Sequence, residues 1–159
     1  MKKKKITGIW LFGLSGSGKT YISRKIGEKI KKNTVIVDGD KVRSYISTDL
    51  GYSKKERKIQ IKRVFGISKI IKDSKMFPIS STVYFDKELK NRCEKIGILP
   101  IRIVRKNFKK VLKKHKTYKN KTNVVGKDIK YEKFNTKKIF NNDTIQPINK
   151  IINIMKNYE

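Results

Sequence analysis

The sequence predicts an α/β fold in which helices cover both faces of a five-stranded parallel sheet, giving a three-layer sandwich. Two observations predict it. Short apolar runs with the length of buried strands alternate along the chain with segments of helical periodicity. In addition, a glycine-rich loop links the first apolar run to an amphipathic helix, as in the first unit of such a sheet.

The expected elements follow one another in the alternating order of a parallel sheet. Strands are expected at 6–12, 34–37, 77–83, 99–104 and 137–140. Helices are expected at 20–32, 40–46, after Ser53, at 86–96, at 107–114 and after residue 143 or 144. Ser53 and Glu56 have the spacing of a capping box, and Gly97 is placed to end a helix. Asp143 or Thr144 is expected to cap the last helix, and 114–123 reads as turns.

Length and cysteine content favour a single domain that covers 1–159. A chain of 159 residues can bury a core without disulfides. Cys93 is the only cysteine, so no intramolecular disulfide can form. The apolar runs are too short to span a bilayer. We therefore expect a cytoplasmic protein that does not enter membranes.

The charge is strongly positive, with 42 lysine and arginine residues against 13 acidic ones and a formal net charge of +29. Such a balance can indicate nucleic-acid binding. However, the basic residues are mostly lysines spread along the chain, and alanine is absent. A biased genomic base composition explains this pattern, so we do not expect a nucleic-acid partner. A basic P-loop protein that binds nucleic acid stays open as an alternative.

Residues 13–20 match the phosphate-loop motif G-x-x-x-x-G-K-[ST] in full, between an expected strand and an expected helix. Backbone N–H groups of such a loop converge on phosphate oxygens. We expect Lys19 to reach the β- and γ-phosphates of ATP and Thr20 to ligate Mg²⁺. The fold is therefore of the P-loop NTPase type, and the predicted ATP-binding residues are Gly13, Ser15, Gly16, Ser17, Gly18, Lys19 and Thr20.

Two carboxylates, Asp38 and Asp40, flank Gly39 at the end of the second expected strand. Next to a phosphate loop, Asp38 could hold Mg²⁺ through water, and Asp40 could orient an attacking hydroxyl. Lys19, Asp38 and Asp40 are thus the predicted catalytic residues, with Thr20 and Asp38 at the metal. Arg43 lies one helical turn later and suits an anionic substrate group.

Three segments together, WLFGLSGSGKT (10–20), VDGDKVR (37–43) and DLGYS (49–53), resemble the adenylylsulfate kinase family. The likeness extends through Arg57 to 64 and returns weakly at 126–128 and 131–133. It implies ATP-dependent phosphorylation of the 3′-hydroxyl of adenylyl sulfate by a P-loop kinase that is usually dimeric. It also implies substrate contacts by Asp40, Arg43, Arg57 and Gln60, and stacking of Tyr52 on the base. A core position for Tyr52 and a solvated face for Arg57 and Gln60 are the alternatives.

The likeness breaks down on the substrate side. The expected basic lid at about 113–127 lacks the family's aspartate and glycine, although Lys116 and Tyr118 could take its lysine and tyrosine places. Val124 stands where the family has an aromatic partner for the base, and Val83-Tyr84-Phe85 replaces its I-S-P. A different nucleotide, such as cytidine diphosphoramidate, and a degenerate kinase therefore stay open. His115 could touch phosphate, but we expect it to be exposed.

Overall fold

Five parallel strands form the central sheet of the computed structural model, which describes residues 5–30 and 33–158. Their order across the sheet is β2-β3-β1-β4-β5, and every neighbouring pair is parallel. The predicted five-stranded parallel sheet is confirmed. The strands are β1 (Gly8–Phe12), β2 (Thr34–Asp38), β3 (Phe77–Thr82), β4 (Ile98–Arg105) and β5 (Lys137–Asn141).

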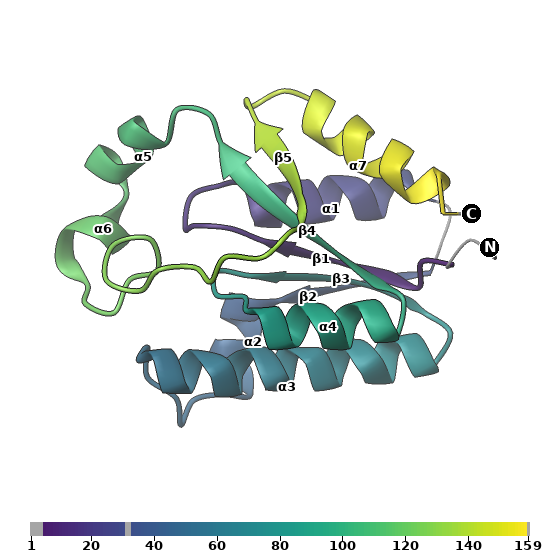
Figure 1. Cartoon of the computed structure of the whole chain (residues 1–159), viewed down its shortest axis with the longest axis horizontal. Helices are drawn as coiled ribbons and strands as arrows, with labels where there is room; N and C mark the ends of the chain where they lie inside the picture. Colours follow the sequence, from purple (N-terminus) through teal and green to yellow (C-terminus); the bar gives the residue numbers. More distant parts are fainter. Residues whose placement is uncertain (1–4, 31–32, 159) are drawn as a thin grey trace.

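Helices cover both faces of this sheet, as the sandwich requires (Figure 1). On one face lie α1 (Lys19–Lys29) and α7 (Gln146–Lys156), and on the other lie α3 (Lys54–Asp73) and α4 (Lys87–Lys95). The short α2 (Gly39–Tyr45) follows β2 directly. Beyond the carboxyl ends of the strands, α5 (Phe108–Lys114) and α6 (Lys116–Asn120) stand apart from the sheet. Helix α6 lies within the segment at about 113–127 that was expected to form a lid, and α5 ends where that segment begins.

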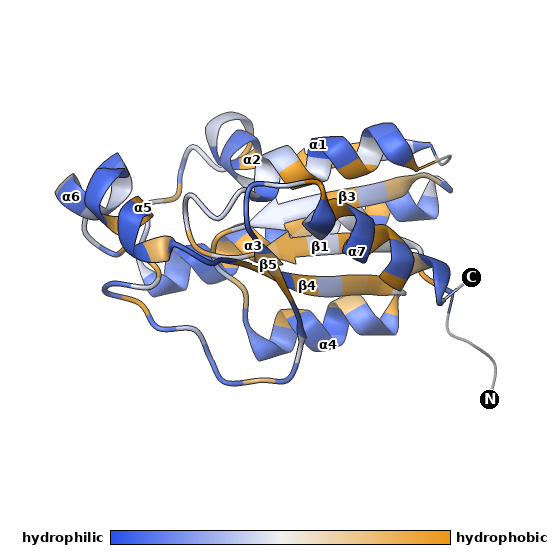
Figure 2. Ribbon diagram, turned by 90° about the horizontal axis from the view of Figure 1, so that it is seen from above, coloured by the Kyte–Doolittle hydropathy of each residue, from blue (hydrophilic) through white to orange (hydrophobic). Residues whose placement is uncertain are grey.

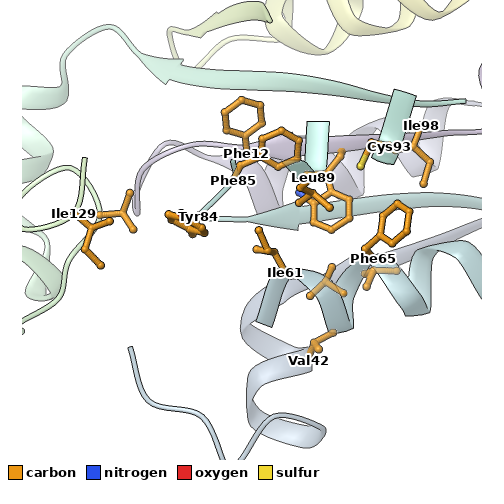
Figure 3. Close-up of a cluster of buried hydrophobic side chains, with 14 residues drawn as sticks. Phe12, Val42, Ile61, Phe65, Tyr84, Phe85, Leu89, Cys93, Ile98 and Ile129 are labelled. Atoms are coloured by element: carbon orange, nitrogen blue, oxygen red, sulfur yellow. The ribbon is translucent and has the colours of Figure 1, made fainter. Parts of the chain in front are cut away.

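Strand β1 separates two hydrophobic cores because its side chains alternate between the two faces. Trp10 and Phe12 join the cluster under α3 and α4, where Phe12 stacks on Phe85 at 4.2 Å between ring centroids (Figure 3). Ile9 and Leu11 join the cluster under α1 and α7. Figure 2 shows the resulting pattern, with apolar stretches along the strands and hydrophilic ones along the helices. The buried strand holds the start of the phosphate loop in place.

Helix boundaries agree with the local sequence signals in most places. Ser53 and Glu56 form the predicted capping box of α3. Asp38 caps α2 and Asp86 caps α4. Gly97 has a φ of 82° just after α4, a left-handed conformation that favours glycine. Each described helix is too short or too polar to cross a bilayer.

Four expectations differ from the structure. Strand β1 begins at Gly8 rather than residue 6, and α1 ends at Lys29, while positions 31–32 of the predicted helix lie outside the described residues. The stretch expected to form turns contains α6. The N-cap residue of α7 is Ile145, which has no capping oxygen. Thr144 Oγ1 instead accepts from the N–H of Gln146 at 3.2 Å.

Candidate active site

A cavity of about 500 Å³ opens at the carboxyl ends of β1, β2 and β3. Ligands of open parallel sheets bind at this edge. The cavity brings together most of the site residues that the sequence predicted, since its lining includes Ser15, Gly16, Gly18, Lys19, Thr20, Asp38, Asp40, Arg43, Tyr52, Arg57, Gln60 and Val124. Of the predicted residues, Gly13, Ser17 and Lys116 are not part of this lining.

The phosphate loop has the sharp bends that its glycines allow. Gly16 and Gly18 have φ values of 79° and 92°. At the φ of Gly18 a side chain would be strained, and its Cβ atom would lie 2.3 Å from Nδ2 of Asn141, so this position favours glycine. The first backbone hydrogen bond of α1 joins the N–H of Ile22 to the Gly18 carbonyl. The loop therefore leads directly into a helix N-terminus, the end of a helix that favours anions.

Lys19 lies inside the curve of this loop. Its Nζ donates to the Leu14 carbonyl at 3.0 Å and to Ser17 Oγ at 3.4 Å. Burial lowers the pKa of Lys19 to about 8, although the nearby Asp40 and Asp38 carboxylates raise it in part. The amine should therefore take up a proton when a polyanion binds beside it.

The acidic turn lies opposite Lys19. Both carboxylate oxygens of Asp38 are engaged, because Oδ2 accepts from Thr20 Oγ1 at 3.0 Å and Oδ1 accepts from the N–H of Asp40 at 2.9 Å. The side chain of Asp40 is exposed, and no described residue bonds to its carboxylate. Asp38 is therefore fixed beside the loop, whereas Asp40 stays available to a ligand.

An exposed aromatic ring with cations around it forms the far side of the cavity. Tyr52 is 46% exposed, which excludes the alternative of a core residue. The guanidinium groups of Arg43 and Arg57 lie 4.6 and 5.4 Å from its ring centroid, and Nζ of Lys121 lies 5.7 Å away. Arg43 also donates to the Gly51 carbonyl at 2.6 Å. This arrangement suits an anionic ligand with a flat group.

Gln60 is buried rather than solvated, at 5% exposure. Its Nε2 donates to the Gly39 carbonyl at 2.9 Å, within the acidic turn. Its Oε1 has no hydrogen-bond partner among the described residues, although it is buried. An unpaired buried oxygen is costly, so this atom is suited to a ligand that donates a hydrogen bond.

The segment that was expected to form a lid contacts the phosphate loop directly. Tyr118 Oη donates to the Ser15 carbonyl at 3.0 Å, and burial raises the pKa of this phenol to about 12. His115 is half-buried and lines the cavity, so the expectation of an exposed histidine was wrong. Lys121 rather than Lys116 lines the cavity from this segment. The role of Lys116 stays a prediction.

Sequence reasoning missed two residues that hold the loop from elsewhere in the chain. Arg105 donates to the Gly16 carbonyl at 3.2 Å, and Asn141 Nδ2 donates to the Ser17 carbonyl at 2.9 Å. Both residues also line a second cavity, of about 630 Å³, which shares Gly16 and His115 with the first. Their position at the carboxyl ends of β4 and β5 is the signal from which they could have been predicted.

Comparison with known proteins places these features in a family context. The family model of adenylylsulphate kinase matches residues 5–122. The adenylyl-sulfate kinase of Pseudomonas aeruginosa is 33% identical over 102 residues, which are 62% of this chain and 52% of that protein. The chain thus spans about half the length of the curated relatives that it matches.

Solved structures share the fold over nearly the whole chain. The Mycobacterium tuberculosis APS kinase CysC, in complex with AMPPNP and APS, gives a TM-score of 0.79 at 19% identity over 96% of this chain and 98% of that one. Shikimate kinase from Aquifex aeolicus gives 0.59 at 15% identity over 94% of this chain and 96% of that one. At these identities the likeness concerns the fold alone.

Proposed function

Because this chain belongs to the adenylylsulphate kinase family, we propose that it transfers the γ-phosphoryl group of ATP to the 3′-hydroxyl of a nucleotide. The main observation behind this proposal is the cavity of about 500 Å³ that the predicted site residues line together. It joins the lining residues of the phosphate loop to the free carboxylate of Asp40 and to the cation-flanked ring of Tyr52. Adenylyl sulfate is the first acceptor to test.

The loop and Lys19 would bind the triphosphate of ATP. Backbone N–H groups and the Nζ amine would neutralise the charge that spreads over the phosphoryl oxygens during transfer. The second cavity, beside Arg105 and Asn141, has the room and the polar groups for the nucleoside half of ATP. Gly16 lines both cavities, so one nucleotide could extend from one into the other.

Thr20 and Asp38 fit a magnesium ion. Mg²⁺ in kinases is held by one or two protein oxygens together with phosphates and waters, so a full protein cage is not needed. The hydroxyl and carboxylate oxygens of these two residues lie 3.0 Å apart beside the loop. When bound, the ion would stabilise charge on the phosphates.

Asp40 is the proposed positioning group and proton acceptor for the attacking hydroxyl. Its carboxylate faces the cavity without a partner from the described residues, and Arg43 lies one helical turn further on to take an anionic group of the acceptor. Asp40→Asn should lower kcat by about 10²- to 10⁴-fold while the affinity for Mg·ATP changes little. Lost ATP affinity with an unchanged kcat would contradict this role.

Two residues of the cavity wall favour a second class of nucleotide as the phosphoryl acceptor. Val124 and Tyr84 line it at places where the family pattern has other residues. A pocket that lacks one stacking partner can admit another base. Cytidine diphosphoramidate is the example to test beside adenylyl sulfate, and dimerisation of the chain stays a prediction.

The deciding experiment is an ADP-release assay with a panel of nucleotides, followed by phosphorus NMR of the product. Adenylyl sulfate, cytidine diphosphoramidate and plain nucleoside diphosphates form the panel. A new 3′-phosphate in any product supports the proposal. Tight ATP binding without phosphorylation of any nucleotide would refute it. Tight binding of generic RNA or DNA that survives saturating ATP would favour the nucleic-acid alternative.

A further inference from the structure

Tyr84 follows the carboxyl end of β3 and has a buried hydroxyl without a partner. The side chain is 3% exposed, and its Oη has no hydrogen bond within the described residues. Leaving such a group unpaired costs about 1–3 kcal/mol. We therefore look for the hydrogen-bond partner of this hydroxyl on a bound ligand rather than within the chain.

Tyr84 belongs to the wall of the 500 Å³ cavity, and its hydroxyl is buried behind that wall. Tyr84 lines that cavity together with Tyr52, Gln60 and Val124. Its ring packs in the core cluster that also contains Val125 and Ile129, and Figure 3 shows Tyr84 at the end of this cluster next to Ile129. The ring is thus fixed in the core, while the residue contributes to the cavity wall on the acceptor side.

The backbone of Tyr84 is held by two hydrogen bonds in series. Trp10 Nε1 donates to Thr82 Oγ1 at 2.9 Å, and that hydroxyl donates to the Tyr84 carbonyl at 2.8 Å. Both side chains are buried. A contact group that is fixed in this way loses little entropy when a ligand binds.

The chemistry of the phenol limits its partner. Burial raises the pKa of Tyr84 to about 12, so the hydroxyl stays neutral at physiological pH. Two arginines, Arg43 and Arg57, line the same cavity and are available to an anionic group. A neutral donor from a residue of the same cavity wall as Val124 is better suited to a neutral acceptor atom of a base.

We propose that the Tyr84 hydroxyl is a specificity-determining contact, which donates a hydrogen bond to a ring nitrogen or carbonyl oxygen on the base of the acceptor nucleotide. This inference rests on the proposed function. Gln60 Oε1, the other unpaired buried atom of the same wall, complements it by accepting from an amino or hydroxyl group of the same ligand.

The test is Tyr84→Phe, which keeps the ring and removes only the oxygen. For the best acceptor of the wild-type panel, kcat/KM should fall about tenfold to a hundredfold, with KM for Mg·ATP unchanged. The urea midpoint of the free protein should rise, because an unpaired hydroxyl is lost. In Tyr131→Phe the midpoint should fall, since the Tyr131 hydroxyl donates to the Val83 carbonyl.

Several results would overturn the inference. An unchanged kcat/KM for every accepted nucleotide would do so while leaving the proposed function intact. A lowered midpoint in Tyr84→Phe would show that the hydroxyl is already bonded in the free protein. If the wild type phosphorylates no nucleotide, the proposed function fails by itself. In that case the panel nucleotides are titrated by calorimetry into the wild type and into Tyr84→Phe, each saturated with a non-hydrolysable ATP analogue. Equal affinity of a nucleotide for the two proteins, or no binding of any nucleotide, refutes the contact.

Discussion

Binding of Mg·ATP should draw a proton onto Lys19. Burial lowers the pKa of this amine to about 8 in the free protein, and a triphosphate beside it should restore the pKa to its ordinary value of 10.5. At pH 8 about half of the lysine is neutral before binding and almost none after, so about half a proton is taken up per nucleotide. The uptake should be about 0.1 proton at pH 7 and about 0.9 at pH 9.

The sign of the pH effect follows from this uptake. Because the complex holds more protons than the free protein, the affinity for Mg·ATP should fall as the pH rises above 8, by at most about tenfold per pH unit. Calorimetric titrations with a non-hydrolysable ATP analogue, in buffers of different ionisation enthalpy at pH 7, 8 and 9, give the number of protons directly. The phosphates are ionised throughout this range.

Lys19→Arg is the matched control. The guanidinium keeps the positive charge, but its pKa lies too high for it to titrate between pH 7 and 9. The variant should bind the analogue without the rising proton uptake. Zero uptake by the wild type at pH 8 and 9, or the same uptake in Lys19→Arg, would refute the assignment of a buried, partly neutral lysine beneath the phosphates.

Three further substitutions test the loop, a helix cap and the lid. Asn141→Ala removes the bond to the Ser17 carbonyl and should raise the Kd for Mg·ATP about five- to tenfold by calorimetry; an unchanged Kd would contradict its role. Ser53→Ala breaks the capping box of α3 and should cost about 1 kcal/mol in urea unfolding, with ATP affinity as the unaffected control. Gly126 has a φ of 91°, and a Cβ there would lie 2.6 Å from Leu14 Cδ2. Gly126→Ala should therefore cost about 1–3 kcal/mol, and a stability equal to the wild type would refute the strain.

The phosphate loop and the acidic turn could be predicted because their signals are local. Lys19 and Thr20 follow from eight consecutive residues, and Asp38 follows from its place at the end of an apolar run. The sandwich follows from the alternation of strands and helices. Each of these features depends on a few neighbouring positions, so a single sequence is enough to find them.

The remaining parts of the site depend on contacts between distant residues. Asn141 reaches the loop across 124 positions, and no local pattern marks it. Helix α6 has five residues, too few to be stable by propensity alone. It is held by Tyr118, which is buried and packs edge-on against Phe108 at 5.6 Å between ring centroids. Such tertiary packing also explains why His115 is less exposed than its lysine-rich surroundings indicate.

The hydrogen bonds to the loop carbonyls fix the orientation of the amide groups that the proposed kinase would use to bind phosphate. In a trans peptide unit the carbonyl and the N–H point in opposite directions. Tyr118 and Asn141 hold the Ser15 and Ser17 carbonyls outward, and so direct the next two amide groups, those of Gly16 and Gly18, the other way. Lifting α6 must break the Tyr118 bond. If the chain acts as the proposed kinase, lifting α6 to release nucleotide would therefore also free the peptide unit between Ser15 and Gly16, and would weaken binding of phosphate by that amide.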